Sequence, residues 1–290
     1  MSMPSYAPLY APLPDPGAYL VRLGINPETY LRSAHPDLPE SPSAYSMPHT
    51  KESLDLLVRE HLFHVPFEDL DTYDLKREVS LAISDLFEKI VVRHRGGYCF
   101  ELNGLLFALI ESLGFDCYPI GMRVAFEGDF PPIAHRATLV TLPEGDRVLC
   151  DVGFGGPAPI TAMYLDKTEP QKSGKLTFRY GHDGPKGLYR QIYLQNDGVE
   201  LVEFLFSDQP VEQADFILSN AYMTHNEGTR FHNNRVLNFL DENGSVAIDN
   251  NVLRIHDNGK LTEVPLLTPE ARKKAYVDYF GMPEDSLTEL

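Results

Sequence analysis

The sequence is poor in basic residues and has no long apolar run. Of its 290 residues, 25 are Lys or Arg and 42 are Asp or Glu, giving a formal net charge of -17 and a pI near 4.9. This balance argues against nucleic acid or another polyanion as a partner, but still allows a small anionic ligand at a helix N-terminus. Because no apolar run approaches the ~20 residues needed to span a bilayer, we expect no membrane partner.

Cysteine is also scarce: the chain contains only Cys99, Cys117 and Cys150. Their odd number and the lack of CxxC-type spacing predict free thiols, no metal site and a cytoplasmic location. The N-terminus has no basic residue before Arg22 and no apolar core of signal-peptide length. Residues 1–15 are therefore predicted to form an extended, proline-rich arm rather than a targeting segment.

The stretch Arg95–Asn103, which reads Arg-Gly-Gly-Tyr-Cys-Phe-Glu-Leu-Asn, opens the most periodic segment of the chain. Apolar residues then recur at helical spacing and predict a helix with one buried face that Gly114 ends. Cys99 would lie at its N-terminus, where backbone N–H groups and the helix dipole stabilise a thiolate. A buried structural cysteine is the alternative explanation.

Other segments show helical or strand patterns. Thr50–Val65 is predicted to be helical, and a second helix is predicted from an N-cap at Ser80 with four buried apolar residues, Ile83, Leu86, Phe87 and Ile90. Short β-rich runs predict strands at Tyr118–Phe126, Arg136–Leu142, Val148–Phe154, within Leu176–Phe206, and at Val236–Leu240 and Val252–Ile255. A last helix should run from Thr268 as N-cap, with Pro269 at N1, to Gly281.

The strands Arg136–Leu142 and Val148–Phe154 are predicted to form a hairpin that brings a histidine and an aspartate together. Pro143-Glu144-Gly145 suits a three-residue turn, which pairs Leu142 with Asp146. Counting outward sets Ala137 opposite Asp151 and brings His135 and Asp151 to the same face of the sheet, with Cys150 on the other face. A cysteine nucleophile needs such a base and such an orienting group. A structural histidine and a turn-capping aspartate remain the alternative.

Arg95–Glu101, His135 and Asp151–Gly155 together resemble the arylamine N-acetyltransferase family. His64–Leu70 is similar to that family's segment upstream of the cysteine, with Asp69 where Asn is usual. The resemblance is strong from about residue 50 to 156 and weak beyond 200. Two further departures are Arg136, where an apolar residue is usual, and Thr224–Phe231, where a proline-containing segment is common. By strand alternation, Arg136 should face away from Asp151.

The resemblance implies an α+β fold with a cysteine-protease or transglutaminase-like Cys-His-Asp core. Its parts would be the arm of residues 1–15, a helical domain of residues 16–95, the catalytic helix with a β-barrel over residues 96–207, and an α/β lid over residues 208–290. Cys99 would accept an acetyl group from acetyl-CoA as a thioester, His135 would act as base, and Asp151 would orient His135. An arylamine, arylhydrazine or hydrazide would then take the acetyl group in a ping-pong reaction.

Further roles come from the same resemblance. Gly153, Tyr222 and Thr229 match positions near the coenzyme, and Arg95 and Glu68 match a supporting ion pair. Phe67 matches an acceptor-pocket aromatic, and we expect Phe126 and Phe130 to shape that pocket as well. Three alternative functions stay open: another acyl-CoA donor, a Cys-His-Asp hydrolase, and a binding module with an unreactive thiol. The acceptor and the oligomeric state are not predicted.

Overall fold

The computed structural model describes residues 5–125, 130–183, 187–242 and 244–290. Its helices are α1 (Pro16–Arg22), α2 (Lys51–His64), α3 (Leu70–Tyr73), α4 (Ile83–Phe87), α5 (Cys99–Ser112), α6 (Phe216–His225), α7 (Arg230–Asn233) and α8 (Pro269–Phe280). Single 3-10 or π turns are η1 (Ala7–Tyr10), η2 (Pro27–Tyr30), η3 (Glu88–Val92), η4 (Gln213–Asp215) and η5 (Glu284–Leu287). Within these described ranges, no helix is long and apolar enough to cross a membrane.

The predicted cysteine helix is present as α5, but it is more deeply buried than expected. Every residue from Cys99 to Ile110 is buried, so the prediction of one buried face is wrong. Contacts with α1, α4, β2 and β3 enclose the helix, and a helix enclosed on all sides carries apolar or small residues all round. Gly114, with φ of +91°, follows its end as predicted.

The helices before α5 match their predicted apolar faces. α2 starts after Thr50, whose hydroxyl accepts a hydrogen bond from the Ser53 amide, and it buries Leu54, Leu57 and Val58. The four residues predicted to be buried by the second helix are buried. The N-cap prediction at Ser80 is wrong, because α4 begins at Ile83. The Ser80 hydroxyl instead accepts from the Ala82 amide and donates to Asp85, which makes a turn before the helix.

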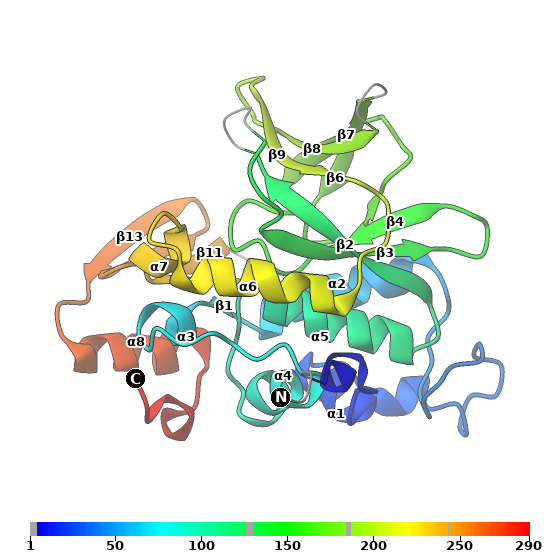
Figure 1. The fold of residues 1–290 in the computed structure, drawn as a ribbon, viewed down its shortest axis with the longest axis horizontal. Helices are drawn as coiled ribbons and strands as arrows, with labels where there is room; N and C mark the ends of the chain where they lie inside the picture. Colours follow the sequence, from blue (N-terminus) through cyan, green and yellow to red (C-terminus); the bar gives the residue numbers. More distant parts are fainter. Residues whose placement is uncertain (1–4, 126–129, 184–186, 243) are drawn as a thin grey trace.

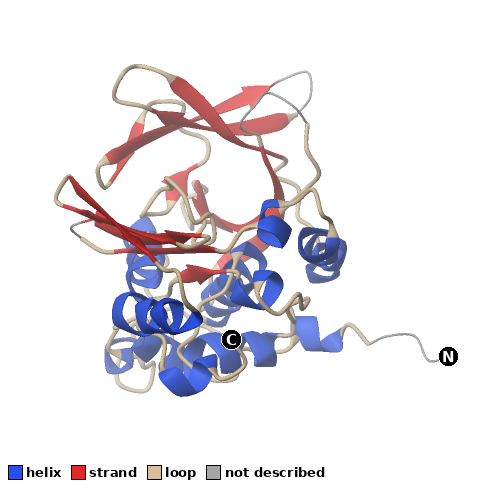
Figure 2. Cartoon of the chain, turned by 90° about the vertical axis from the view of Figure 1, so that its left-hand side faces the viewer, coloured by secondary structure: helices blue, strands red, loops and turns tan. Residues whose placement is uncertain are grey.

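An antiparallel eight-stranded sheet curls into a nearly closed, barrel-like structure above α5 (Figures 1 and 2). Its strands are β2 (Asp116–Val124), β3 (His135–Thr141), β4 (Arg147–Cys150), β5 (Met163–Tyr164), β6 (Gln171–Ser173), β7 (Leu176–Asp183), β8 (Leu188–Leu194) and β9 (Glu200–Phe206), in the order β5-β4-β3-β2-β9-β8-β7-β6. Ala137 and Leu139 pack into the interior of this sheet, whereas Val140 packs into the core around α5. Strand β3 thus separates two cores.

The register of the β3–β4 hairpin is as predicted. The Leu142 amide donates to the Asp146 carbonyl over 2.8 Å, Thr138 pairs with Cys150, and Gly145 has a φ of +93°. The predicted continuation of the strand to Phe154 is wrong, since β4 ends at Cys150. The next amides bond to side chains instead: Val152 donates to Asn103 and Gly153 to Asp151, each over 2.9 Å.

A second, five-stranded antiparallel sheet lies beside the first and joins distant parts of the chain (Figure 2). It contains β1 (Phe67–Glu68), β10 (Val236–Leu240), β11 (Gly244–Asp249), β12 (Val252–Asp257) and β13 (Lys260–Pro265), in that order. The predicted bounds of β10 are confirmed, β12 is two residues longer than predicted, and β1, β11 and β13 were not predicted. Because β1 pairs with β10, the segment just before the Cys99 helix contributes a strand to this C-terminal sheet.

The two ends of the chain differ in how well their structure was predicted. Thr268 caps α8 by accepting from the Ala271 amide, Pro269 begins the helix, and Gly281 ends it with a φ of +64°. The extended N-terminal arm is a wrong prediction, because Ala7–Tyr10 form the 3-10 turn η1 and Leu13 is buried. A hydrogen bond from the Tyr10 hydroxyl to Glu212 also ties this segment to the rest of the molecule.

Candidate active site

Cys99 is the first residue of α5, as the sequence predicts, and only 3% of it is exposed. The chain approaches this position through Gly96, where a Cβ would lie 2.0 Å from the Pro66 carbonyl oxygen. Glycine is therefore required for this close approach. The Glu101 carboxylate accepts a hydrogen bond from the Tyr98 amide over 3.0 Å, which fixes the start of the helix.

His135 and Asp151 are joined by a short hydrogen bond. The distance from His135 Nε2 to Asp151 Oδ2 is 2.7 Å, and both side chains are almost fully buried. The ring of His135 stacks on Phe204 with centroids 4.8 Å apart, and Phe154 packs against it edge-on. Since Nε2 is held by the carboxylate, Nδ1 is the ring nitrogen left for proton transfer.

Asn103 links the cysteine helix to this pair. It lies four residues after Cys99 and thus on nearly the same face of α5. Its amide group donates to Asp151 Oδ1 over 2.8 Å and to the Arg136 carbonyl over 2.6 Å. Although burial raises the pKa of Asp151, its interactions with His135, Asn103 and the Gly153 amide lower the pKa below its ordinary value. Asp151 is therefore held as a carboxylate.

The sulfur of Cys99 lies at the N-terminal end of β3. It contacts the Ala134 carbonyl, which is 3.7 Å away and belongs to the residue before His135. Burial raises the pKa of the Cys99 thiol, and the Asp151 carboxylate raises it further, whereas the Phe100 amide lowers it. The amide at the helix start lowers the pKa of the thiol as expected, but desolvation has the larger effect and favours the thiol over the thiolate.

Gly153 fills the space between the helix and the pair. A Cβ at this position would lie 2.8 Å from Cys99 Cα and 2.7 Å from Asn103 Nδ2. Any larger residue would push the Asp151 segment away from α5. We expected Gly153 to contact the coenzyme. Its tight packing against α5 is by itself a sufficient reason for a glycine at this position.

The predicted acceptor aromatics are found in different environments. Phe67 is buried, packs against Gly155 and Phe231, and lines a cavity of about 20 Å³ with Asp151 and Phe154. That space holds about one water molecule. Phe130 is 54% exposed, and Phe126 lies outside the described residues.

The other two residues predicted to contact the coenzyme, Tyr222 and Thr229, belong to α6 and the loop after it. Tyr222 is 43% exposed on α6. Thr229 is buried, and its hydroxyl donates to the carbonyls of Met223 and Asn226. The Thr229 side chain therefore shapes the loop between α6 and α7, whereas the Tyr222 side chain is exposed to solvent.

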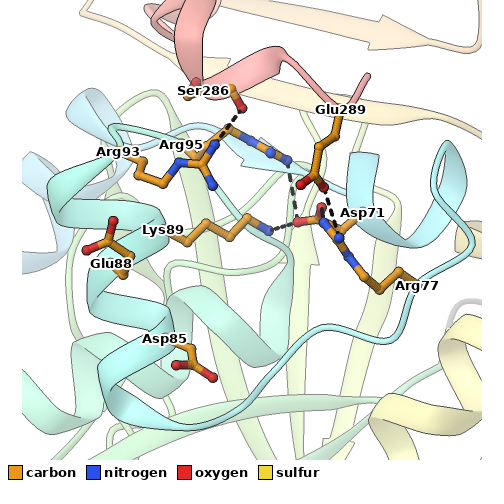
Figure 3. Close-up of a pocket in the computed structure, with 9 residues that line it drawn as sticks. All are labelled: Asp71, Arg77, Asp85, Glu88, Lys89, Arg93, Arg95, Ser286 and Glu289. Carbon is orange, nitrogen blue, oxygen red and sulfur yellow. Dashed lines mark hydrogen bonds and ion pairs between the residues drawn. The ribbon is translucent and has the colours of Figure 1, made fainter.

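Arg95 and Glu68 form the ion pair that the sequence suggested, within a larger group of charges. Glu68, Asp71, Lys89, Arg95 and Glu101, here called the ionic cluster, lie on the other side of the α5 start from Asn103. Arg95 is 2.7 Å from Glu68, and Lys89 is 2.6 Å from Asp71 and 2.7 Å from Glu101. Figure 3 shows Lys89 and Arg95 converging on Asp71 beside a cavity of about 280 Å³.

A family model described as N-acetyltransferase matches residues 50–286. The chain belongs to the arylamine N-acetyltransferase family. Its relative in Mycolicibacterium smegmatis is 26% identical over 273 residues, which is 92% of each chain. The arylamine N-acetyltransferase of Escherichia coli is 29% identical over 240 residues, 80% of this chain and 84% of its own.

Solved structures of the arylamine N-acetyltransferase family share this fold. The M. smegmatis structure has a TM-score of 0.80 at 25% identity and covers 94% of both chains. The Mycobacterium marinum enzyme, solved in complex with CoA, has a TM-score of 0.78 at 22% identity, covering 95% of this chain and 97% of its own. At that identity, the M. marinum likeness shows the fold alone.

One departure from the family pattern has a simple explanation in this member. Asp69, where the family usually has Asn, is 2% exposed. Its Oδ1 accepts from the Val236 amide, and its Oδ2 has no hydrogen-bond partner among the residues that the structure describes. Burial raises the pKa of Asp69 well above its ordinary value, with smaller effects of Glu68 and Asp74 in the same direction. A protonated carboxyl is neutral, so Asp69 can replace an amide here.

Two features of the site were not predicted from the sequence. Asn103 was part of the opening stretch but was given no role, although its spacing of four residues from Cys99 was a usable signal. Lys89, Asp71 and Glu101 join Arg95 and Glu68 from three segments, and no local pattern marks such a cluster. Both features depend on how the segments meet in space.

Proposed function

We propose that this chain moves an acetyl group from acetyl-CoA, through a thioester on Cys99, to an arylamine, arylhydrazine or hydrazide. The observation that carries the proposal is the buried His135–Asp151 hydrogen bond beside a cysteine at a helix start. Family membership supports the reaction class, and the CoA complex of a relative with the same fold agrees with a CoA thioester as donor.

In the first half-reaction, Cys99 Sγ attacks the thioester carbonyl of acetyl-CoA while its proton passes to His135. The new S–C bond replaces the bond to the coenzyme sulfur, and CoA leaves after taking up that proton. Because burial raises the pKa of the thiol, we expect the thiolate to form only together with an imidazolium. Asp151 would stabilise that imidazolium and hold the ring in orientation.

In the second half-reaction, the amine nitrogen attacks the acetyl-enzyme carbonyl, and His135 accepts the proton that the nitrogen loses. The amide forms, the S–C bond breaks, and Cys99 recovers its proton. Negative charge on the carbonyl oxygen would be stabilised by free backbone N–H groups at the start of α5. The Asn103 bonds keep Asp151 in register with the helix during both steps.

We further propose the expected division of labour for the rest of the chain. Phe67, Phe126 and Phe130 would shape the acceptor pocket, Gly153, Tyr222 and Thr229 would lie along the coenzyme, and residues 208–290 would act as a lid over a cysteine-protease-like core in residues 96–207. Residues 16–95 would form the supporting helical domain, with Arg95 and Glu68 as structural support. A cytoplasmic location suits a nucleophile that works only as a free thiol.

Acetyl-enzyme formation tests the proposal directly. The protein is mixed with acetyl-CoA without amine, and its intact mass is measured. One acetyl adduct is expected, absent in Cys99→Ala and retained in Cys150→Ala, the matched control for a buried cysteine on the other face of the hairpin. Adding an aromatic amine or hydrazine should remove the adduct and yield the amide. Without any adduct, or with one that survives Cys99→Ala, the proposal fails.

The same assay separates the alternatives. A malonyl or propionyl adduct forming faster than the acetyl adduct would change the donor and keep the mechanism. A hydrolase would lose its adduct to water at the same rate with and without amine. Transfer to amine at least tenfold faster than loss to water supports the transferase.

A further inference from the structure

Arg136 is a buried cation with no role in the steps above. It is 2% exposed and among the largest fully buried side chains. Its guanidinium donates to Gln213 over 2.8 Å and lies 4.4 Å from the centre of the Phe216 ring, while its Nε has no hydrogen-bond partner in the described part of the chain. These partners are neutral, and among the described residues no carboxylate lowers the cost of the charge. A buried charge without a counterion is unusual because desolvation opposes it.

The guanidinium lies along α5, the helix that begins with Cys99. Its Nη1 is 3.1 Å from the point that a Cβ on Gly104 would occupy, so this glycine makes room for it. Two residues before Arg136, the Ala134 carbonyl contacts Cys99 Sγ at the start of the same helix. Cys99 and Gly104 are five residues apart, which separates them by about 7.5 Å along the helix axis and about 140° around it. Charges interact across such a distance when little water lies between them.

We propose that Arg136 is a positioning residue whose buried positive charge stabilises the Cys99 thiolate. The inference rests on the proposed role of Cys99 as nucleophile. Neighbouring residues of a strand point to opposite faces, so His135 meets Asp151 on one face of β3 while Arg136 meets α5 and α6 on the other. His135 takes the proton, and Arg136 favours the charge that the proton leaves behind.

The charges around the thiol explain why such a residue is useful. Burial and the Asp151 carboxylate raise the pKa of Cys99, and Glu101 on its own helix adds to them, whereas the Phe100 amide and Arg136 lower it. His135 is bound to Asp151 and balances that carboxylate only when it is protonated. Glu101 is already offset by Lys89, 2.7 Å away, so without Arg136 the pKa of the thiol would be set mainly by burial and the Asp151 carboxylate.

The test measures alkylation of Cys99 by iodoacetamide as a function of pH in the full-length protein. Peptide masses separate Cys99 from the half-buried Cys117, and Cys99→Ala gives the background. In Arg136→Met, we expect the pH midpoint to rise by about one unit, which means about tenfold slower alkylation at neutral pH. Arg136→Lys keeps the charge and should keep the wild-type midpoint. Acetyl-enzyme formation should follow the same shift in its pH profile.

Variants of Gln213 keep the test decisive if Arg136→Met does not fold. Gln213→Glu sets a carboxylate beside the guanidinium and should raise the midpoint with Arg136 in place, while Gln213→Leu should leave it unchanged. A wild-type midpoint in Gln213→Glu or in folded Arg136→Met overturns the inference, as does an equal shift in Arg136→Lys. Alkylation needs no donor or amine, so a shifted midpoint without any acetyl transfer supports the inference and contradicts the proposed function.

Discussion

Two buried polar groups flank the start of α5 and differ in how their charges are arranged. The ionic cluster meets the helix at Glu101, and the His135–Asp151 pair meets it at Asn103. Glu101 and Asn103 are two positions apart, and side chains at this spacing on a helix point about 200° apart. The two groups therefore lie on opposite sides of α5. In the ionic cluster, Glu68, Asp71 and Glu101 each contact a cation, and Arg77 adds a further cation at the rim.

The side of the helix that faces the proposed chemistry is less balanced. It holds Asp151, a histidine that is not permanently charged, a thiol and the lone guanidinium of Arg136. In a group whose charges are already paired, adding or removing a proton breaks an existing ion pair. In a group with unpaired charges, a proton transfer can improve the charge balance. We conclude that the ionic cluster fixes the helix start, and that the opposite side is arranged for changes in charge.

The largest expected effect comes from breaking the balance of the ionic cluster. Arg95→Met leaves Glu68 buried and deprived of its closest cation. Removing one partner of a buried ion pair costs about 3–5 kcal/mol, and we expect the free energy of unfolding to fall by that amount. Urea denaturation at neutral pH measures it.

Arg77→Met is the matched control for this change. Arg77 contacts Asp71 of the same cluster, but its side chain is 54% exposed. Exposed ion pairs contribute less than about 1 kcal/mol, so this variant should be nearly as stable as the wild type. If both variants lose equal stability, the ionic cluster is not the scaffold we infer.

A smaller loss of stability but a larger loss of activity is expected on the other side of the helix. Asn103→Ala removes the bonds to Asp151, the Arg136 carbonyl and the Val152 amide, which should cost about 1–3 kcal/mol. The released Asp151 segment should lower kcat about 100-fold, because small misplacements of catalytic groups are costly.

Asn220→Ala separates the two effects. Asn220 is also a buried asparagine, and it donates to the Val79 carbonyl over 2.9 Å and accepts from the Tyr98 hydroxyl. We expect a similar loss of stability with kcat within a few-fold of the wild type. Equal activity of the Asn103 and Asn220 variants would contradict the role of Asn103.

An effect that is small at any one pH tests a carboxyl that belongs to neither group. Asp69 neighbours Glu68 in sequence but pairs with no cation among the described residues, and its raised pKa means that its stabilising effect is fully present at acid pH and lost as the pH rises through its folded pKa. Asp69→Asn should therefore gain stability relative to the wild type with rising pH, by up to about 1.4 kcal/mol per unit. Thermal unfolding between pH 5 and 9 measures this, and a constant difference would refute it.

Local signals were enough to predict several parts of the structure. The turn at Gly145 fixed the register that brings His135 and Asp151 together, and the capping residues Thr268 and Gly281 bounded the last helix. These features depend on neighbours a few residues apart. Cys99 was found in the same way, from a glycine pair followed by helical periodicity.

Features that depend on distant segments were missed or mistaken. Periodicity marked one face of α5, but enclosure by other elements decided how much of it is buried. Val148–Phe154 has strand propensity throughout, yet the Asn103 side chain takes the hydrogen bond that would continue the strand. The pairing of Phe67 with Asn238 joins residues so far apart that no local pattern could indicate it.

That pairing has a consequence for how the protein is made. β1 and the Cys99 segment leave the ribosome well before β10, so β1 lacks its partner strand until most of the chain has been synthesised. During this interval the segment around Cys99 also lacks Asn220, which accepts a hydrogen bond from the Tyr98 hydroxyl in the finished fold. A newly made chain thus carries its proposed nucleophile before the segments that complete the surrounding structure have been synthesised.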